Sequence, residues 1–347
     1  MKDKATSFDI AHLAGVSQST VSRALRNSPL VNQETRDKVQ AIARELNYKV
    51  DKNASSLRQQ HSRTIALLLF EDPTSDDSMI NPFFLSMLGS ITKACAQEGY
   101  DLLVSFQQFS DDWHADYEDT NKADGIILLG YGDYVDYQDK LTKLEQQQTH
   151  FVRWGAVDNE HPGLSIGCDN FQGGYKITQH LIRHGRKHFA FIGGADSHCP
   201  EFFERFKGMS HALQQAGAGK PPIQIDAITK EDSGYQAATE LLSRNAPLDA
   251  IVCASDLIAI GVMHALHDSG KRIPEDIAVV GYDNILAASF TNPPLTTVHQ
   301  NTKLAGEMLV KTLVRMIQGE PQQAGLLPAE LVIRQSCGRK HDQDVSA

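Results

Sequence analysis

Several polar side chains follow short apolar runs of the sequence, at the points where buried strands would end. Asp283 follows IAVVGY, and Ser255 and Asp256 follow AIVCA. Ligands of open α/β sheets bind at the carboxyl ends of the strands, so these positions are candidates for a binding site. A carboxylate such as Asp283 accepts hydrogen bonds from two neighbouring hydroxyls, and an arginine such as Arg205 donates a pair from its planar guanidinium. For each side chain, the structural alternative is a cap or loop hydrogen bond.

Three histidines recur every four residues, at His180, His184 and His188. This spacing would suit metal ligands on one helix face, but Gly185 ends the helix before the third histidine. We therefore expect a cationic, solvated helix end and no metal site. The sequence contains no HExxH, GxSxG or Walker A string, so it indicates neither an enzyme nor a cofactor. Its five cysteines are widely spaced without a CxxC pair, which favours reduced, buried thiols.

A helix-turn-helix pattern covers residues 8–24, FDIAHLAGVSQSTVSRA, in which Gly15 takes the turn. Ser17 is suited to cap the second helix, and a third helix is expected after Asn32, to about Leu46. The shared apolar seam is predicted to contain Ile10, Leu13, Ala14, Val16, Val21 and Ala24. The exposed side of the second helix carries short donors and acceptors that can reach bases or phosphates in a major groove, namely Gln18, Ser19, Thr20, Ser22 and Arg23.

The 347-residue chain has ordinary globular composition, with 41% hydrophobic and 22% charged residues and a net charge of −10. Residues 1–63 nevertheless hold 11 basic and 6 acidic side chains, so the remainder carries −15. A basic head on an acidic body is typical of a polyanion-binding module joined to a part with another task. The sequence shows no signal peptide and no apolar run of 18 residues, so we expect a cytoplasmic protein.

From Thr64 onward, short apolar runs alternate with amphipathic stretches, which is typical of parallel sheets buried on both faces. This alternation predicts two doubly wound α/β subdomains. Strands are expected at 64–70, 101–106, 125–130, 150–152, 189–194, 250–255, 277–283, 293–300 and 329–334. Helices are expected at about 83–98, 205–216, 257–269 and 302–318.

The runs DIAHLAGVSQSTVSRAL, TRDKV, ELNY and NASSLR closely resemble the head of the LacI/GalR family of bacterial transcription regulators. The resemblance continues through nearly the whole chain. It implies an α/β protein with an N-terminal three-helix, lambda-repressor-like head and a body like the type I periplasmic binding proteins. The expected boundaries are 1–50 for the DNA-binding domain, 51–62 for a hinge helix or linker, 63–340 for the body and 341–347 for the tail. Within the body, the N-subdomain would comprise 63–163 and 296–324, and the C-subdomain 164–292 and 325–340.

The resemblance assigns roles in DNA binding to residues of the head. Gln18, Ser19 and Arg23 would contact base edges. Arg26 stands where the family often has Asn, and we expect a phosphate contact there. The hinge would become a helix in the minor groove, where Leu57 acts as an apolar wedge. Further phosphate-contact positions are Thr6, Ser17, Thr20, Asn32 and Thr35, and further hinge positions are Asn53, Ala54 and Arg58.

In the body, ERFKG matches the family's effector-binding arginine at Arg205, and GYDN matches its effector-binding aspartate at Asp283. The segment NPFF matches a pocket segment of the N-subdomain, and it offers an apolar platform. The acidic stretch 71–80 departs from the family pattern. The remaining effector-binding positions implied by the resemblance are Ser255, Gln300, Phe83, Phe84 and, from the short match FV before it, Arg153.

Aromatic residues gather between positions 113 and 154 and could stack on the apolar faces of sugar rings. Core packing explains some of them equally well, and a nucleobase or another metabolite would suit the same kind of mixed pocket. They are Trp113, Tyr117, Tyr131, Tyr134, Tyr137 and Trp154. We therefore predict a small-molecule effector, with a sugar favoured and a purine or other metabolite acting as corepressor as the alternative.

Together these patterns predict a transcription regulator, a repressor by resemblance, in which an effector between the two subdomains controls operator affinity. Two symmetric heads of a homodimer would read a palindromic double-stranded operator on the nucleoid, because one small head makes few base contacts. No membrane partner is expected. The alternative is a cytoplasmic sugar-binding protein or sugar enzyme whose head is a protein-interaction module.

Overall fold

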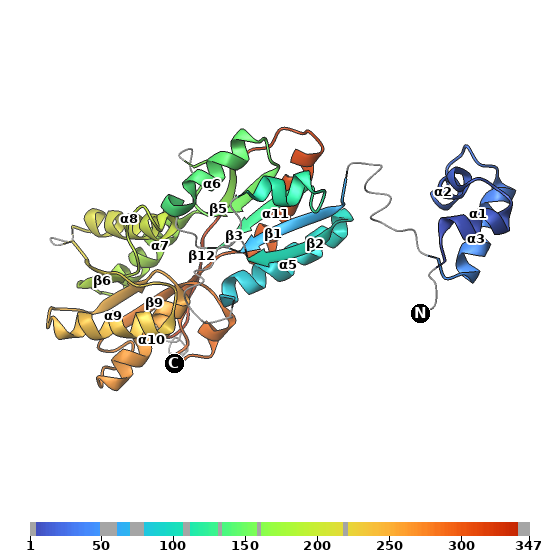
Figure 1. Ribbon diagram of the computed structural model, residues 1–347. Helices are drawn as coiled ribbons and strands as arrows, with labels where there is room; N and C mark the ends of the chain where they lie inside the picture. The colour runs from blue at the N-terminus through green and yellow to red at the C-terminus, as the bar shows by residue number, and fades with distance from the viewer. Residues whose placement is uncertain are drawn as a thin grey trace. The chain divides into compact units, whose positions relative to one another are not determined.

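The computed structural model describes residues 5–48, 61–69, 80–106, 112–130, 134–157, 161–217 and 221–338. The chain forms two compact units, a head, Met1–Ser62, and a body, Arg63–Ala347 (Figure 1). The body is the predicted α/β fold with two largely parallel sheets, and the head is the predicted three-helix domain. Among the described residues, none of the helices has the combination of length and apolar character that crossing a membrane requires.

The head consists of three short helices around a small apolar core. Ile10, Val21 and Val39, one from each helix, are completely buried. Gly15 has a φ of 68° and provides the left-handed turn between the first two helices. Leu13, expected in the seam, is instead 56% exposed, because Ile10 and Ala14 already form the buried stripe of its helix. The helices are α1 (Ser7–Ala14), α2 (Gln18–Leu25) and α3 (Gln33–Glu45).

The first sheet of the body contains six parallel strands in the order β11-β5-β4-β3-β1-β2. Its interior strands are almost wholly apolar, as expected when both faces are covered. Helices α5 (Pro82–Glu98) and α11 (Thr302–Ile317) pack side by side on one face, and α6 (Tyr134–Gln146) and the π-helix η1 (Ala115–Asp119) lie on the other. The strands are β1 (Thr64–Leu69), β2 (Asp101–Phe106), β3 (Gly125–Leu129), β4 (Phe151–Trp154), β5 (Leu164–Cys168) and β11 (Gly325–Leu327).

The second sheet also has six strands, in the order β12-β10-β9-β8-β6-β7, and only β12 is antiparallel among its described pairings. Two helix pairs pack on it, α7 with α8 and α9 with α10. The strands are β6 (Phe189–Ile192), β7 (Ile223–Ile225), β8 (Ala250–Cys253), β9 (Ala278–Asp283), β10 (Thr296–His299) and β12 (Glu330–Val332). The helices are α7 (Asn170–Arg183), α8 (Pro200–Gln215), α9 (Glu231–Ser243), α10 (Asp256–Asp268) and the short 3₁₀ helix η2 (Leu286–Ser289).

The expected subdomain boundaries assigned three strands to the wrong sheet. Strand β5 pairs with β4 and β11 in the first sheet, although residues 164–292 were expected in the C-subdomain. Strand β10 pairs with β9 in the second sheet, and β11 lies in the first. The chain therefore crosses between the sheets after β5, after β10 and again after β11. Apolar patterning marks a strand but does not specify its hydrogen-bonding partner, which explains these corrections.

Candidate functional site

The exposed polar face predicted for the second helix of the head is present on α2. Ser17 caps this helix by accepting a hydrogen bond from the Thr20 amide at 3.2 Å, and its hydroxyl lies 2.8 Å from that of Ser19. Gln18 donates to the Ser7 hydroxyl at 2.7 Å, so its side chain is oriented across the two helices. Arg23 is exposed in the last turn. The face can therefore offer several polar groups to a base edge or a phosphate.

The predicted phosphate-contact residues lie largely at helix N-termini. Thr6 caps α1 in a capping box with Asp9, and Asn32 caps α3 by accepting from the Thr35 amide at 2.8 Å. Helix N-termini attract anions through their free amides and dipoles, so a cap and a phosphate contact are compatible roles. Arg26 bonds back to Ser22, with 2.9 Å between Nη2 and the hydroxyl. The hinge positions Asn53, Ala54, Leu57 and Arg58 lie outside the described residues.

In the body, Arg205 is held in a buried position on α8, where it is only 1% exposed. Its Nε donates to Asn170 Oδ1 at 2.8 Å, and its Nη1 donates to the carbonyl of Ala254. The guanidinium carbon lies 3.7 Å from the centroid of the Tyr282 ring and 4.9 Å from that of Phe202. These contacts fix the planar cation against two aromatic rings, and guanidinium groups pack favourably on such rings.

Asp283 lies at the end of β9, close to this cation. It is 3% exposed, and its Oδ1 accepts a hydrogen bond from Gln300 Nε2 at 2.7 Å. The same oxygen lies 3.9 Å from Arg205 Nη1. The structure thus brings together three of the predicted effector residues at the carboxyl edge of the second sheet. A buried ion pair with a further amide donor can orient hydroxyl or amide groups of a polar ligand.

Ser255 lies beside this cluster, but its hydroxyl is engaged within the protein. The side chain is fully buried and caps α10 by accepting from the Ile258 amide at 3.3 Å. Its chain neighbour Ala254 supplies the carbonyl that binds Arg205. The cap, which is the structural alternative for this residue, is therefore observed.

Asn170 and Tyr282, two polar residues that contact Arg205, were absent from the predicted site. Asn170 is the first residue of α7 and follows β5 closely, a placement of the same kind that made Asp283 a candidate. Tyr282 belongs to the motif GYDN, and its hydroxyl lies 4.0 Å from the Cys168 sulfur across the two sheets. Burial raises the pKa of the Cys168 thiol to about 11 and raises that of Tyr282 well above its ordinary value. Both groups are therefore neutral at physiological pH.

Two hydrogen bonds tie the Arg153 side chain to backbone carbonyls near the end of its own strand. It lies on β4 in the first sheet, 2% exposed, where Nη1 donates to the Ala156 carbonyl at 3.1 Å. Its Nε donates to the Pro162 carbonyl at 3.3 Å. These bonds support a structural role in holding the segment after β4.

The aromatic residues divide between two cores. Phe83 and Phe84 are each 1% exposed and pack edge to face, and Phe83 lies 6.0 Å from Trp154 between ring centroids. Trp113 and Tyr117 are buried in the separate core beneath α6 and η1, so packing accounts for them. Tyr137 packs on Trp113, whereas Tyr131 and the side chain of Tyr134 lie outside the described part of the chain.

The histidine series does not form a metal centre in the described part of the chain. The rings of His180 and His184 lie 4.2 Å apart, and His180 Nε2 contacts the Cys337 sulfur at 3.2 Å. His188 follows the helix-ending Gly185 and precedes β6, as the spacing argument expected. Across the residues that the structure describes, no group of three potential ligands is placed to hold a metal ion.

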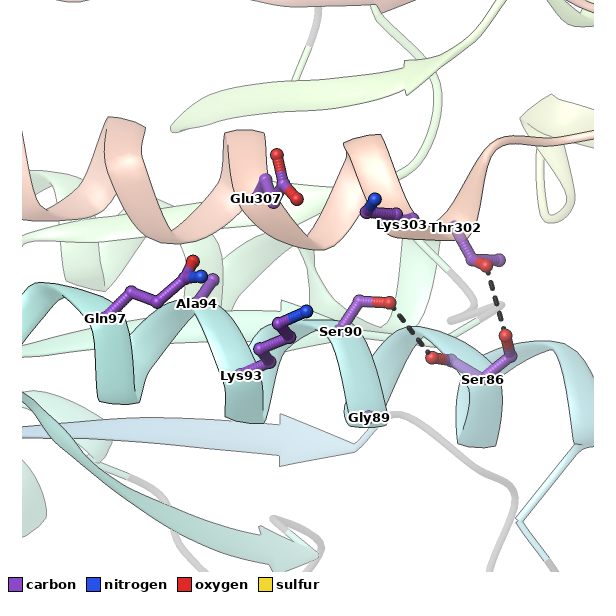
Figure 2. Close-up of a pocket in the computed structure, with 9 residues that line it drawn as sticks. All are labelled: Ser86, Gly89, Ser90, Lys93, Ala94, Gln97, Thr302, Lys303 and Glu307. Carbon is purple, nitrogen blue, oxygen red and sulfur yellow. Dashed lines mark hydrogen bonds between the residues drawn. The ribbon is translucent and has the colours of Figure 1, made fainter.

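A groove of about 320 Å³ lies between α5 and α11 (Figure 2). Ser86 and Thr302 join its two walls through hydroxyls 3.1 Å apart. None of the seven predicted effector positions lines it. The lining residues are Ser86, Gly89, Ser90, Lys93, Ala94 and Gln97 from α5, and Thr302, Lys303 and Glu307 from α11.

Comparison with known proteins matches both units of the chain. Residues 8–51 match the family of bacterial regulatory proteins of the lacI type, and residues 178–337 match a periplasmic binding protein-like domain. The HTH-type transcriptional repressor PurR of Pasteurella multocida (strain Pm70) is 30% identical over 338 residues, which cover 96% of this chain and 98% of the relative.

Two solved structures each cover 96% of this chain and 99% of their own. A complex of the transcriptional regulator CelR with cellobiose is 29% identical, with a TM-score of 0.69. The lac repressor dimer bound to operator and the anti-inducer ONPF is 26% identical, with a TM-score of 0.83.

Proposed function

Since the chain belongs to the LacI family of bacterial transcriptional repressors, we propose that its operator affinity is controlled by a small molecule bound at the Arg205–Asp283 cluster. The observation that carries this proposal is the near-complete burial of an ion pair, with Arg205 Nη1 and Asp283 Oδ1 3.9 Å apart, at the carboxyl edge of a parallel sheet. Burying two opposite charges is costly unless both are well paired, so such a pair commonly serves a specific site.

The head supports sequence-specific DNA binding through α2. Gln18, Ser19 and Arg23 are proposed to contact base edges, while the caps at Thr6 and Asn32 contact phosphates. Leu57 is proposed to insert into the minor groove at the centre of the operator, with Asn53, Ala54 and Arg58 beside it. A regulator of this kind acts on chromosomal DNA in the cytoplasm.

A homodimer is proposed because one head contacts too few bases for specificity. Two heads would read the halves of a palindrome about one helical turn, roughly 34 Å, apart. The body offers a candidate contact surface at η2, where Leu286 and Phe290 are 76% and 78% exposed. Exposed apolar patches commonly mark protein–protein contacts, and these two side chains come from one short segment. The related lac repressor structure is a dimer on its operator.

For the effector we propose a sugar. A carboxylate and a guanidinium together can hold adjacent hydroxyls, and cellobiose is the ligand of the related CelR complex. Trp113 and Tyr117 no longer support this choice, because both belong to a core. A purine or another metabolite acting as corepressor is the other outcome of the test below.

The test is a mobility shift with DNA from upstream of the gene, with and without cellobiose, ribose, ribose 5-phosphate or guanine. We expect one fragment to be retarded and one compound to change its affinity by about 10-fold or more, since such coupling energies are typical of allosteric regulators. A thermal-shift assay with the same panel identifies the bound compound. If no fragment is retarded even at low salt, the chain is a metabolite-binding protein or an enzyme with an interaction head.

Calorimetry then assigns the site. Asp283→Ala is expected to weaken binding of the active compound by about 100-fold, because it leaves Arg205 buried without its nearby carboxylate. The control Asp232→Ala removes a carboxylate from the exposed first turn of α9 and is expected to leave binding unchanged. Equal affinity in the wild type and Asp283→Ala would remove Asp283 from the site.

A further inference from the structure

The turn that carries the Asp283 carboxylate has an unusual backbone. Asp283 and Asn284 have φ values of 108° and 56°, so two successive residues other than glycine occupy a region that side chains disfavour. Such a conformation persists only when surrounding contacts hold it. Contacts that fix this turn therefore also fix the direction in which the Asp283 carboxylate points.

Asp256 holds the two backbone amides that follow Asp283. It binds the Ile285 amide directly and the Asn284 amide through the Thr297 hydroxyl. Its Oδ2 accepts from the Ile285 amide at 2.8 Å, and its Oδ1 accepts from the Thr297 hydroxyl at 2.6 Å. The Thr297 hydroxyl oxygen in turn accepts from the Asn284 amide at 3.3 Å. One carboxylate on α10 thus connects the turn after β9 to strand β10.

Asp256 reaches this position only because β9 carries glycine beside it. A Cβ at Gly281 would lie 2.2 Å from Asp256 Oδ1, which is closer than van der Waals contact allows. Asp256 is completely buried, and its two side-chain oxygens are engaged by the Ile285 amide and the Thr297 hydroxyl. Burial, and then the nearby carboxyl of Asp283, raise the pKa of Asp256 well above its ordinary value.

We propose that Asp256, acting through Thr297 and the Ile285 amide, is a positioning residue that holds the Asp283 carboxylate in its ligand-binding direction. This inference rests on the proposed effector role of Asp283. It assigns to Asp256 no contact with the effector, and it predicts that loss of Asp256 acts only through the turn at Asp283.

Amide hydrogen exchange of the full-length protein tests the hold on the turn without any ligand. In Asp256→Ala we expect the Ile285 amide to exchange about 10-fold faster than in the wild type, as loss of one buried hydrogen bond predicts. The Ala254 amide, bonded to Ile192 within the same sheet, is the internal reference and should be unchanged. Asp256→Asn keeps one carbonyl oxygen for the Ile285 amide and should exchange nearly as slowly as the wild type.

The matched control is Asp249→Ala. Asp249 directly precedes β8, at the amino-terminal ends of the strands of the same sheet. Asp249 also holds backbone amides, those of Lys187 and His188, at 3.0 and 2.9 Å. Its loss should speed the exchange of those two amides and leave Ile285 unchanged. Should Asp256→Ala fail to fold, Thr297→Val removes the bridging hydroxyl and should speed exchange at Asn284.

Calorimetry with the compound that stabilises the wild type, beginning with cellobiose, tests the effect on binding. Asp256→Ala should weaken binding by about 10-fold or more, and Asp249→Ala should not. In the Asp283→Ala background, with cellobiose concentrations raised until binding is measurable, Asp256→Ala should have no further effect, because its partner in binding is gone. A purely structural role would weaken binding equally in both backgrounds.

The outcomes separate the two proposals. If no compound of the panel stabilises the wild type, the effector proposal fails, while Ile285 exchange still decides whether Asp256 holds the turn. If Ile285 exchange is unchanged in Asp256→Ala, or if binding weakens equally with and without Asp283, the positioning role is overturned. Faster local exchange, together with weakened binding only where Asp283 is present, establishes it.

Discussion

At the scale of single residues, the body concentrates its charge chemistry in a few buried side chains. The Arg205 guanidinium donates hydrogen bonds to the Asn170 amide oxygen and the Ala254 carbonyl, and its planar face packs on the Tyr282 ring. A lysine has neither the fork nor the plane, so it cannot make this set of contacts. The residue type at this position therefore follows from geometry as well as from charge.

We predict that Arg205→Lys lowers effector affinity by about 10-fold or more and the free energy of unfolding by about 2 kcal/mol, because buried acceptors lose their donors. Calorimetry and urea unfolding measure the two effects. Arg244→Lys is the control, since the Arg244 side chain forms an exposed ion pair with Glu240; it should change stability by less than about 0.5 kcal/mol. Similar losses in both variants would show that Arg205 has no special role.

At the scale of elements, the second sheet is covered by helix pairs that approach through glycine. A Cβ at Gly208 of α8 would lie 2.0 Å from the Phe171 carbonyl, and one at Gly174 of α7 would lie 2.1 Å from the Arg205 carbonyl. Only glycine permits this approach of the two backbones. Arg205 on α8 and Asn170 on α7 are consequently within hydrogen-bonding distance.

We predict that Gly208→Ala separates α7 from α8, costs about 1–3 kcal/mol of unfolding free energy and weakens effector binding. Thermal unfolding and calorimetry are the measurements. Gly89→Ala on α5 is the matched control, because its Cβ would meet no atom within 4 Å; it should stabilise the protein by about 0.5–1 kcal/mol. Retention of full effector affinity in Gly208→Ala would disconnect the helix contact from the site.

A second element-scale feature joins the π-helix η1 to the start of β4. Glu118 Oε1 accepts from the His150 amide at 2.8 Å and lies 3.4 Å from His150 Nδ1. The hydrogen bond with Glu118 raises the pKa of His150 above its ordinary 6.5, and the carboxylates of Glu118 and Asp124 act in the same direction. The stabilising contribution of the charged pair is complete below about pH 6.5 and is lost as the pH rises through the raised value.

We therefore predict that His150→Gln lowers the melting temperature more at pH 6 than at pH 8.5, by roughly 1–2 °C, because the pair is partly exposed and screened. Differential scanning calorimetry at the two pH values measures the effect. Glu118→Gln should show the same trend, since it removes the other partner of the pair. A decrease in melting temperature that is independent of pH would contradict this account.

At the scale of the whole molecule, the body is two sheets joined by three chain crossings, and the polar cluster lies where they meet. Cys168 ends β5 in the first sheet, and Tyr282 lies on β9 in the second, with 4.0 Å between sulfur and hydroxyl. A ligand that binds one relative orientation of the two sheets more tightly will favour that orientation. The proposed control of DNA binding requires that this change in sheet orientation alters how the two heads of the dimer bind the operator.

The dimer prediction is tested at η2. Phe290→Asp is expected to raise the dimer dissociation constant by about 10-fold or more and to weaken operator binding, because a charge replaces an apolar contact. Sedimentation equilibrium and mobility shift measure the two effects. Ile228→Asp changes another exposed apolar residue, 61% exposed, and should leave the dimer intact. Unaltered dimerisation of Phe290→Asp would place the interface elsewhere.

Local chemistry made much of this architecture predictable from the chain itself. Capping residues and Gly15 define the helices of the head, apolar runs define β1, β3 and β9, and the position of Asp283 directly after such a run marks it as a candidate ligand-binding residue. Each of these signals depends on neighbours within a few residues. Periodicity, capping and turn chemistry act at that range, which explains their success.

The sheet assignment of β5, β10 and β11 and the core location of Trp113 depended on tertiary structure, as did the inclusion of Asn170, Tyr282 and Thr297 around the polar pair. Thr297 and Asp256 are 41 residues apart in the chain yet share a 2.6 Å hydrogen bond. The sequence by itself determined the helices of the head, most of the strands and several strand ends that carry polar groups, whereas β5, β7, β11, α6 and α9 were not among the expected elements. Only the folded chain decided which of those ends meet, because strand pairing and side-chain contact are set by long-range packing that local pattern does not encode.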